Sequence, residues 1–182
     1  MSRYPPSVLL FVLGLAPIGL QLSVPSDVAA IPIQAVAPDD VCDAKSNPAK
    51  LNFTFRDVAG KLFSLETLKG KVVLIDFWAT YCVPCKQEIP AFVDFQTRYG
   101  DRGFQVIGLS VDDPVSKLRP FIADFKVNYP VLLVNSSHRV LDAYTVQGLP
   151  VNILIGRDGK ICRRHSGPTA ADVFEREIKS LL

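Results

Sequence analysis

The spacing of hydrophobic residues along this chain changes several times, between the two-residue period of strands and the wider period of helices. The clearest change begins with an apolar run at 72–77, which ends just before Cys82 and Cys85. From residue 83 to about residue 99, apolar side chains then recur three and four positions apart. This pattern predicts a buried strand that leads into a helix, with Pro84 in the first helical turn, where proline is favoured.

The same pattern places the remaining elements. Further strands are predicted at 51–55, 104–111, 131–134, 151–155 and 160–164, a hairpin across Gly60, and helices at 112–125, 136–144 and 169–181. We expect Pro120 to interrupt the first of these helices, and Thr169 to cap the last, with Asp172 at the capping-box distance. Strands that alternate with helices, followed by a hairpin and a last helix, predict an α/β fold with a mixed central sheet between helices.

Residues 1–30 do not fit this pattern. Arg3 precedes an apolar stretch at 8–22, and Val28-Ala29-Ala30 offers small residues to a signal peptidase. We expect a secretory signal, with an uncleaved N-terminal membrane anchor as the alternative. Residues 31–50 are expected to form a linker or arm, and residues 51–182 the folded domain. A net charge of +2 in 182 residues excludes a basic face for nucleic acid.

The Cys-x-x-Cys pair carries the chemistry. At the start of a helix, unpaired backbone N–H groups and the helix dipole stabilise the thiolate of Cys82. Cys85 lies one turn further on the same side, so the two sulfur atoms can form a disulfide. One exposed thiol and one covered thiol suit thiol–disulfide exchange, in which Cys82 attacks a substrate disulfide and Cys85 resolves the mixed disulfide.

The segment from Gly70 to Pro90 resembles the active-site segment of the thioredoxin superfamily. In detail it is similar to the extracytoplasmic TlpA/ResA branch, whose pattern is roughly G-K-V-V-L-x-x-F-W-A-T-W-C-x-P-C-x-x-E-x-P, with Tyr81 in place of the second Trp. The resemblance covers about residues 50 to 182. It implies a thioredoxin-like fold with an N-terminal β extension, and a thiol–disulfide oxidoreductase without a cofactor.

The resemblance also implies partners. The expected substrates are disulfides of partner proteins, which this chain would reduce as a monomer, and a membrane thiol donor of the DsbD/CcdA kind would recharge it. A role in cytochrome c maturation, or related redox work in the cell envelope, is implied as well. The dipeptide Val83-Pro84 lacks the acid that some cytochrome-maturation relatives carry there, which argues against a haem-protein substrate.

Asp76 lies inside the apolar strand. A buried carboxyl group without a partner has a raised pKa, which suits a general base that deprotonates Cys85 through a water. Thioredoxins carry an Asp at the matching position, so the resemblance supports this role. The alternatives are a carboxylate that caps a backbone group at the strand end, or one that pairs with Lys71 or Lys86.

Pro150 resembles the cis-proline that faces the cysteine pair in this fold, and Leu149 would then offer its backbone to a substrate strand. An ordinary trans turn is the alternative. Trp78 and Tyr81 are candidates for the rim that shields the sulfur atoms, although either ring could belong to the core. Val151-Asn152 stand where Thr-Thr is usual, which leaves substrate preference open.

Cys42 and Cys162 remain as a second pair. In an exported chain we expect them to form a structural disulfide that pins the arm to the sheet. Closing a loop of about 120 residues would stabilise the fold by about 4–5 kcal/mol in the chain-entropy treatment. Two free thiols, or a dimer through Cys42, are the alternatives.

Two other functions use the same cysteines. Cys82, Cys85, Cys162 and His165 would supply a Cys₃His set for zinc, and Cys82 with Cys85 could carry Cu(I) in a metal chaperone. We expect no metal site, because the secreted context favours disulfides. A peroxidase would need a Pro-x-x-x-Thr-x-x-Cys context, and Ile75 and Ala79 occupy the Pro and Thr positions.

Overall fold

A computed structural model of the chain describes residues 42, 46–111, 113–134 and 138–182. The predicted signal or anchor at 1–30, and all of the predicted arm except 42 and 46–50, lie outside these residues. Within the described ranges no helix has the length and apolar character needed to cross a bilayer.

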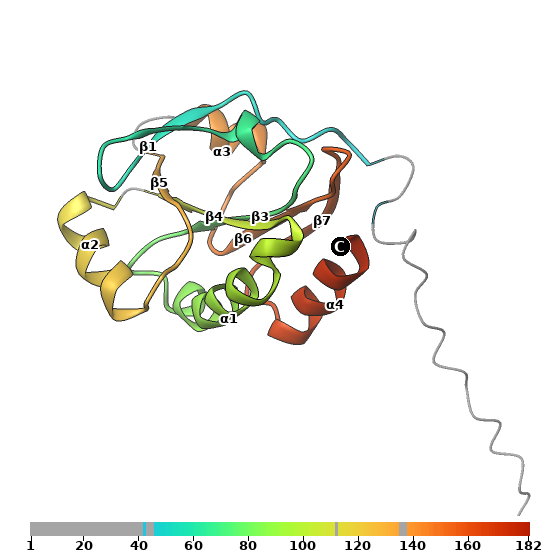
Figure 1. Cartoon of the computed structure of the whole chain (residues 1–182). Coiled ribbons are helices and arrows are strands. Elements are labelled where there is room, and N and C mark those ends of the chain that lie inside the picture. Colours follow the sequence, from blue (N-terminus) through green and yellow to red (C-terminus); the bar gives the residue numbers. More distant parts are fainter. Residues whose placement is uncertain (1–41, 43–45, 112, 135–137) are drawn as a thin grey trace, which may run out of the picture. The chain divides into compact units, whose positions relative to one another are not determined.

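Seven strands form one mixed sheet in the order β2-β1-β5-β4-β3-β6-β7 (Figure 1). Their bounds are β1 Thr54–Asp57, β2 Leu62–Ser64, β3 Val72–Trp78, β4 Phe104–Ser110, β5 Val131–Leu133, β6 Val151–Ile155 and β7 Ile161–Ser166. The helices are η2 Leu65–Leu68, α1 Val83–Tyr99, η3 Gly100–Arg102, α2 Val115–Asp124, α3 His138–Ala143 and α4 Ala171–Leu181. The predicted α/β class with a mixed central sheet is confirmed.

Strand β3 lies inside the sheet between β4 and β6, parallel to β4 and antiparallel to β6, and all of its residues are buried. Because side chains alternate along a strand, β3 packs on two layers. Leu74 and Trp78 pack with residues of α1, α2 and α4, whereas Ile75 and Phe77 pack with residues of α3 and η2. Figure 1 shows α1 and α4 on one side of the sheet and α3 on the other.

Three local expectations are wrong. The first strand begins at Thr54 rather than residue 51, since only Thr54–Asp57 pairs with β2 and β5. Helix α2 continues through Pro120, which lies in the middle of the helix, so the one backbone hydrogen bond that this proline removes does not end the helix. Helix α4 has Ala170 as its N-cap, without a side-chain cap. Thr169 does not cap it, because its N–H donates to Glu88 and its hydroxyl donates to the Gly167 carbonyl.

Candidate active site

The junction between β3 and α1 holds the cysteine pair. Cys82 is the N-cap of α1, and its Sγ accepts a hydrogen bond from the Cys85 backbone N–H at 3.3 Å. Pro84 lies in the first helical turn, as predicted from its position in the sequence. Cys82 and Cys85 form a disulfide. Cys82 is 7% exposed and Cys85 is fully buried, so an attacking thiol reaches the Cys82 sulfur more easily.

The loop before Cys82 is fixed by a buried carboxylate. Asp113, which is 5% exposed, accepts hydrogen bonds from the Thr80 backbone N–H at 2.8 Å and the Thr80 hydroxyl at 2.6 Å. The Ser110 hydroxyl at the end of β4 donates to the same carboxylate at 2.9 Å. Sequence reasoning missed this contact, because the pairing of β3 with β4 brings together residues that are distant in the chain.

Asp76 lies on the β3 face that packs against α1 and is 1% exposed. Neither of its carboxyl oxygens has a hydrogen-bond partner in the described part of the chain, so it does not pair with Lys71 or Lys86. Burial holds the pKa of Asp76 well above its usual value, and the negative charge of Glu88 raises it further. Burial therefore favours the neutral form of this carboxyl group.

Glu88 and Asn152 complete the buried polar group, although the sequence analysis assigned no catalytic role to either residue. Glu88, on α1, is 6% exposed; its Oε2 accepts from Asn152 Nδ2 at 3.0 Å and its Oε1 from the Thr169 N–H at 2.8 Å. Burial raises the pKa of Glu88, and these two hydrogen bonds oppose that rise. The available signals were Glu88 itself in the Gly70–Pro90 pattern and Asn152 in place of a usual Thr.

The expected surface residues lie in different environments. The Leu149–Pro150 peptide bond is cis, with Leu149 partly buried at the turn that leads into β6. Tyr81 is 65% exposed and Val83 61% exposed on either side of Cys82. Trp78 is 1% exposed and packs against Phe121 at 4.8 Å between ring centroids, so it belongs to the core and not to the rim.

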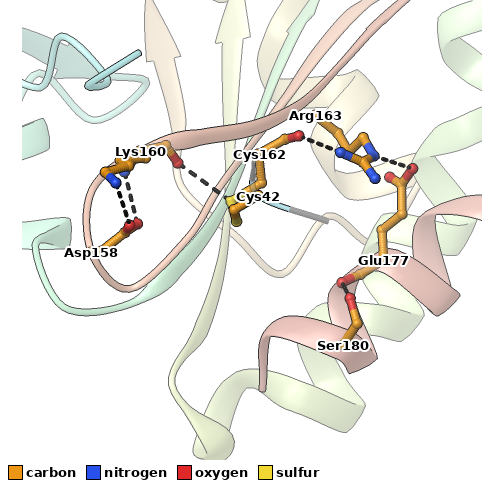
Figure 2. The surroundings of a disulfide bond; sticks show 7 residues. All are labelled: Cys42, Asp158, Lys160, Cys162, Arg163, Glu177 and Ser180. Carbon is orange, nitrogen blue, oxygen red and sulfur yellow. Dashed lines mark hydrogen bonds and ion pairs between the residues drawn. A yellow bond between two sulfur atoms is a disulfide. The ribbon is translucent and has the colours of Figure 1, made fainter. Parts of the chain in front are cut away.

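Cys42 and Cys162 form a second disulfide at the far end of the β6–β7 hairpin (Figure 2). At that end of the hairpin Ile155 pairs with Ile161, and Ile155 also pairs with Val73 near the start of β3. Cys82 instead follows the other end of β3. Because Cys162 is bonded to Cys42, the Cys₃His zinc set is not assembled. In the described ranges, no three His, Cys, Asp or Glu side chains are arranged to hold a metal ion.

Figure 2 shows how this disulfide is connected to its surroundings. Arg163 donates to the Cys162 carbonyl at 2.9 Å and lies 3.6 Å from the carboxylate of Glu177 on α4. Gly156 leaves the space that the sulfur atoms occupy: a Cβ there would lie 3.0 Å from Cys162 Sγ and 3.3 Å from Cys42 Sγ. A larger residue at 156 would therefore require the bridge or its neighbours to shift.

Comparison with known proteins gives a consistent result. A sequence profile of the AhpC/TSA family matches residues 46–164. Thiol-disulfide oxidoreductase ResA from Halalkalibacterium halodurans is 30% identical over 132 residues, which are 72% of this chain and 74% of that protein. ResA from Bacillus subtilis is 35% identical over 116 residues, 64% of each protein.

Solved structures agree with the sequence matches. A thiol:disulfide interchange protein of the thioredoxin family from Chlorobium tepidum TLS superposes with a TM-score of 0.70 at 30% identity, over 77% of this chain and 99% of that one. One from Bacteroides sp. gives a TM-score of 0.65 at 29% identity, over 75% and 91%. With its cysteine pair at the start of α1, the chain belongs to the thioredoxin-like AhpC/TSA family and is a thiol–disulfide oxidoreductase similar to ResA.

Proposed function

We propose that this enzyme reduces disulfides of partner proteins outside the cytoplasm. The observation that carries the proposal is the placement of the Cys82–Cys85 pair at the helix start, with the buried carboxyl group of Asp76 on the β3 face that packs against the same helix. The pair supplies two electrons, and Asp76 supplies a place for the proton that must leave Cys85.

The proposed reaction has two steps. The Cys82 thiolate attacks one sulfur of the substrate disulfide, and the other substrate sulfur leaves as a thiolate that takes a proton from water. Cys85 then gives its proton to the Asp76 carboxylate through a water, and its thiolate attacks Cys82 Sγ. The bond between Cys82 and the substrate breaks, the second substrate thiolate leaves, and the enzyme holds the Cys82–Cys85 disulfide.

The substrate is proposed to dock around Cys82. Tyr81 and Val83 are exposed large side chains on either side of the nucleophile, and exposed apolar groups of this kind contact partner proteins. The backbone of Leu149, before cis-Pro150, would pair with an extended substrate segment. Because this contact uses backbone groups, it would accept many partner sequences.

Two features support a place outside the cytoplasm. The leader at 1–30 has the composition of a secretory signal or anchor, and the Cys42–Cys162 bridge is of the kind that persists in oxidising compartments. A membrane thiol donor would then recharge the enzyme, since cytosolic reductants do not reach it. Cytochrome c maturation, or a related task in the envelope, is the proposed context.

A redox titration tests the direction. The purified protein is equilibrated with thiol buffers while the fluorescence of Trp78, the only tryptophan in the chain, is followed beside a Cys82→Ser control. We expect a two-electron transition near the thioredoxin value of about −270 mV. A potential near about −120 mV, typical of strong oxidants, would reverse the direction. No transition, with copper or zinc bound instead, would favour the metal-chaperone alternative.

A further inference from the structure

A row of polar residues crosses the sheet beneath α1. Asp76 on β3 pairs directly with Asn152 on β6, and Asn152 pairs directly with His165 on β7. Directly opposed residues of antiparallel strands point to the same face, with Cβ atoms about 4.5–5.5 Å apart. The side chain of Asn152 therefore lies between Asp76 and His165, and Glu88 of α1 contacts it.

Some buried oxygen atoms in this row have no hydrogen-bond donor in the described part of the chain. Asn152 Nδ2 donates to Glu88, but the Asn152 amide oxygen is buried and has no donor in the described part of the chain. Both carboxyl oxygens of the neighbouring Asp76 are buried and without a donor as well. Buried polar atoms are nearly always paired, so three such atoms on directly opposed residues require an explanation. A proton on Asp76 would supply the missing donor.

We propose that Asn152 is a positioning residue through which Asp76 and Glu88 hold one proton between them. Its amide N–H donates to an ionised Glu88, while its amide oxygen accepts from a protonated Asp76. An amide offers donors on one side and an acceptor on the other, so it matches one charged and one neutral carboxyl group better than two of the same kind. This inference extends the proposed role of Asp76 as the group that accepts the Cys85 proton.

The surroundings favour this distribution of charge. Glu88 accepts N–H groups at both oxygens, which stabilises its carboxylate, whereas Asp76 receives none. Burial raises the pKa of both groups, but hydrogen bonds oppose the rise only at Glu88. The resulting state, with the proton on Asp76, belongs to the disulfide form, in which Cys85 has already lost its proton.

Other groups act on the pair from neighbouring elements. The Tyr129 phenol before β5 interacts with Asp76, and the buried Trp78 indole N–H has no hydrogen-bond partner among the residues that the structure describes. His165 interacts with Glu88 and lies 2.8 Å from a carboxyl oxygen of Glu177 on α4. In the described ranges, none of these groups both lies directly opposite Asp76 in the sheet and donates to Glu88, as Asn152 does, so the link between the two carboxyl groups is assigned to Asn152.

The first test needs no substitution at residue 152. In the disulfide form, carbon-13 NMR of the carboxyl groups is followed against pH, with Asp76→Asn and Glu88→Gln variants used to assign the two signals. We expect that at pH 6 the Asp76 carboxyl group is protonated and the Glu88 carboxyl group is ionised. Two ionised or two protonated groups at that pH would overturn the proposal.

The second test compares two side chains of nearly equal shape. Asn152→Thr keeps a hydroxyl that can donate once and accept once, whereas Asn152→Val can do neither. In the Val variant the one-proton state loses both hydrogen bonds, so the upper titration midpoint should fall and the lower one should rise, each by about one pH unit. The Thr variant should keep at least half of the original separation.

Several results would reject the role of Asn152. Unchanged midpoints in the Val variant would do so, and equal shifts in the Thr and Val variants would show that side-chain shape, not hydrogen bonding, matters. Tyr144→Phe is the control, because it removes a buried hydroxyl that donates to the Lys50 carbonyl at 3.0 Å on the other face of the sheet. Its titration should match that of the parent.

A kinetic measurement separates this inference from the proposed function. If Asp76→Asn does not slow resolution of the mixed disulfide, the proposed base is wrong even if the NMR detects one shared proton. If Asp76→Asn slows resolution but the NMR detects no shared proton, the base stands and the role of Asn152 fails.

Discussion

Thr80 is bound to Asp113 twice, through its backbone N–H at 2.8 Å and its hydroxyl at 2.6 Å. Since Thr80 lies two residues before Cys82, this contact joins the loop before Cys82 to the segment that follows β4. We expect Asp113→Ala to lower the free energy of unfolding by about 2–3 kcal/mol, because three donors lose their acceptor. The displaced loop should also slow reaction with substrate by about tenfold. Urea unfolding and stopped-flow kinetics measure the two effects.

Asp101→Ala is the matched control for that experiment. Asp101 is exposed, on η3, and a change at such a position should leave both quantities within error. Equal losses in the two variants would mean that the Thr80 contact contributes little.

The two active-site cysteines should give opposite results when each is replaced. Cys85→Ser keeps the nucleophile but removes the resolving thiol, so a mixed disulfide with the substrate should accumulate. Cys82→Ser should trap nothing, because Cys85 is fully buried. Non-reducing electrophoresis and mass spectrometry of the adduct identify the bonded cysteine. An adduct through Cys85 in the Cys82→Ser protein would assign the roles the other way round.

Asp76 should make stability depend on pH. Folding raises the pKa of Asp76 above the usual 3.8. The contribution of the protonated carboxyl group to the free energy of unfolding is therefore fully present below pH 3.8, and it is lost as the pH rises toward the folded-state pKa. Over that range the parent should lose up to about 1.4 kcal/mol per pH unit relative to Asp76→Asn, which has no proton to lose. Chemical unfolding of the parent and of Asp76→Asn, each in its disulfide form, from pH 4 to pH 9 gives the difference in their free energies of unfolding. A constant difference would contradict burial of a titrating Asp76.

The second disulfide should stabilise the domain without taking part in exchange. Replacing Cys42 and Cys162 together by Ala should lower the free energy of unfolding by about 2–5 kcal/mol. The redox potential of the Cys82 pair should change little, since the two bridges lie at opposite ends of β3 and β6. A large change in that potential would indicate that the bridges are coupled.

Gly156 should matter because of the bridge beside it. In the parent, Gly156→Ala places a Cβ at 3.0 Å from Cys162 Sγ and should cost about 1–3 kcal/mol. In the protein without Cys42 and Cys162, the same substitution should cost less, because both sulfur atoms are absent. Unfolding curves of the four proteins complete this double-mutant cycle. An equal loss of unfolding free energy in both backgrounds would assign the loss to the backbone or to the contact with Asp158 instead.

Features set by neighbouring residues could be predicted from the sequence. The apolar run of β3, the position of Pro84 and the spacing of Cys82 and Cys85 are local, and each produced the expected element. For Pro150, the resemblance to the thioredoxin fold, and not a local signal, indicated a cis bond, and that peptide bond is cis.

Features that depend on strand register could not be predicted in the same way. Asn152 lies beside Asp76 only because β6 pairs with β3 at one register, and no local signal fixes that register. Trp78 looked like a rim residue because it precedes the cysteines, but strand alternation places it on the buried face with Asp76. Thr169 looked like a helix cap, but Glu88 takes its N–H.

Strand β6 begins directly after cis-Pro150, and Asn152 is its second residue. The turn proposed to dock substrates and the proposed partner of the buried acids therefore share one short length of backbone. An insertion or deletion of a single residue between them would turn Asn152 to the α3 face and put an aliphatic side chain beside Asp76. The two proposed roles therefore tolerate substitutions in this stretch but not a change in its length.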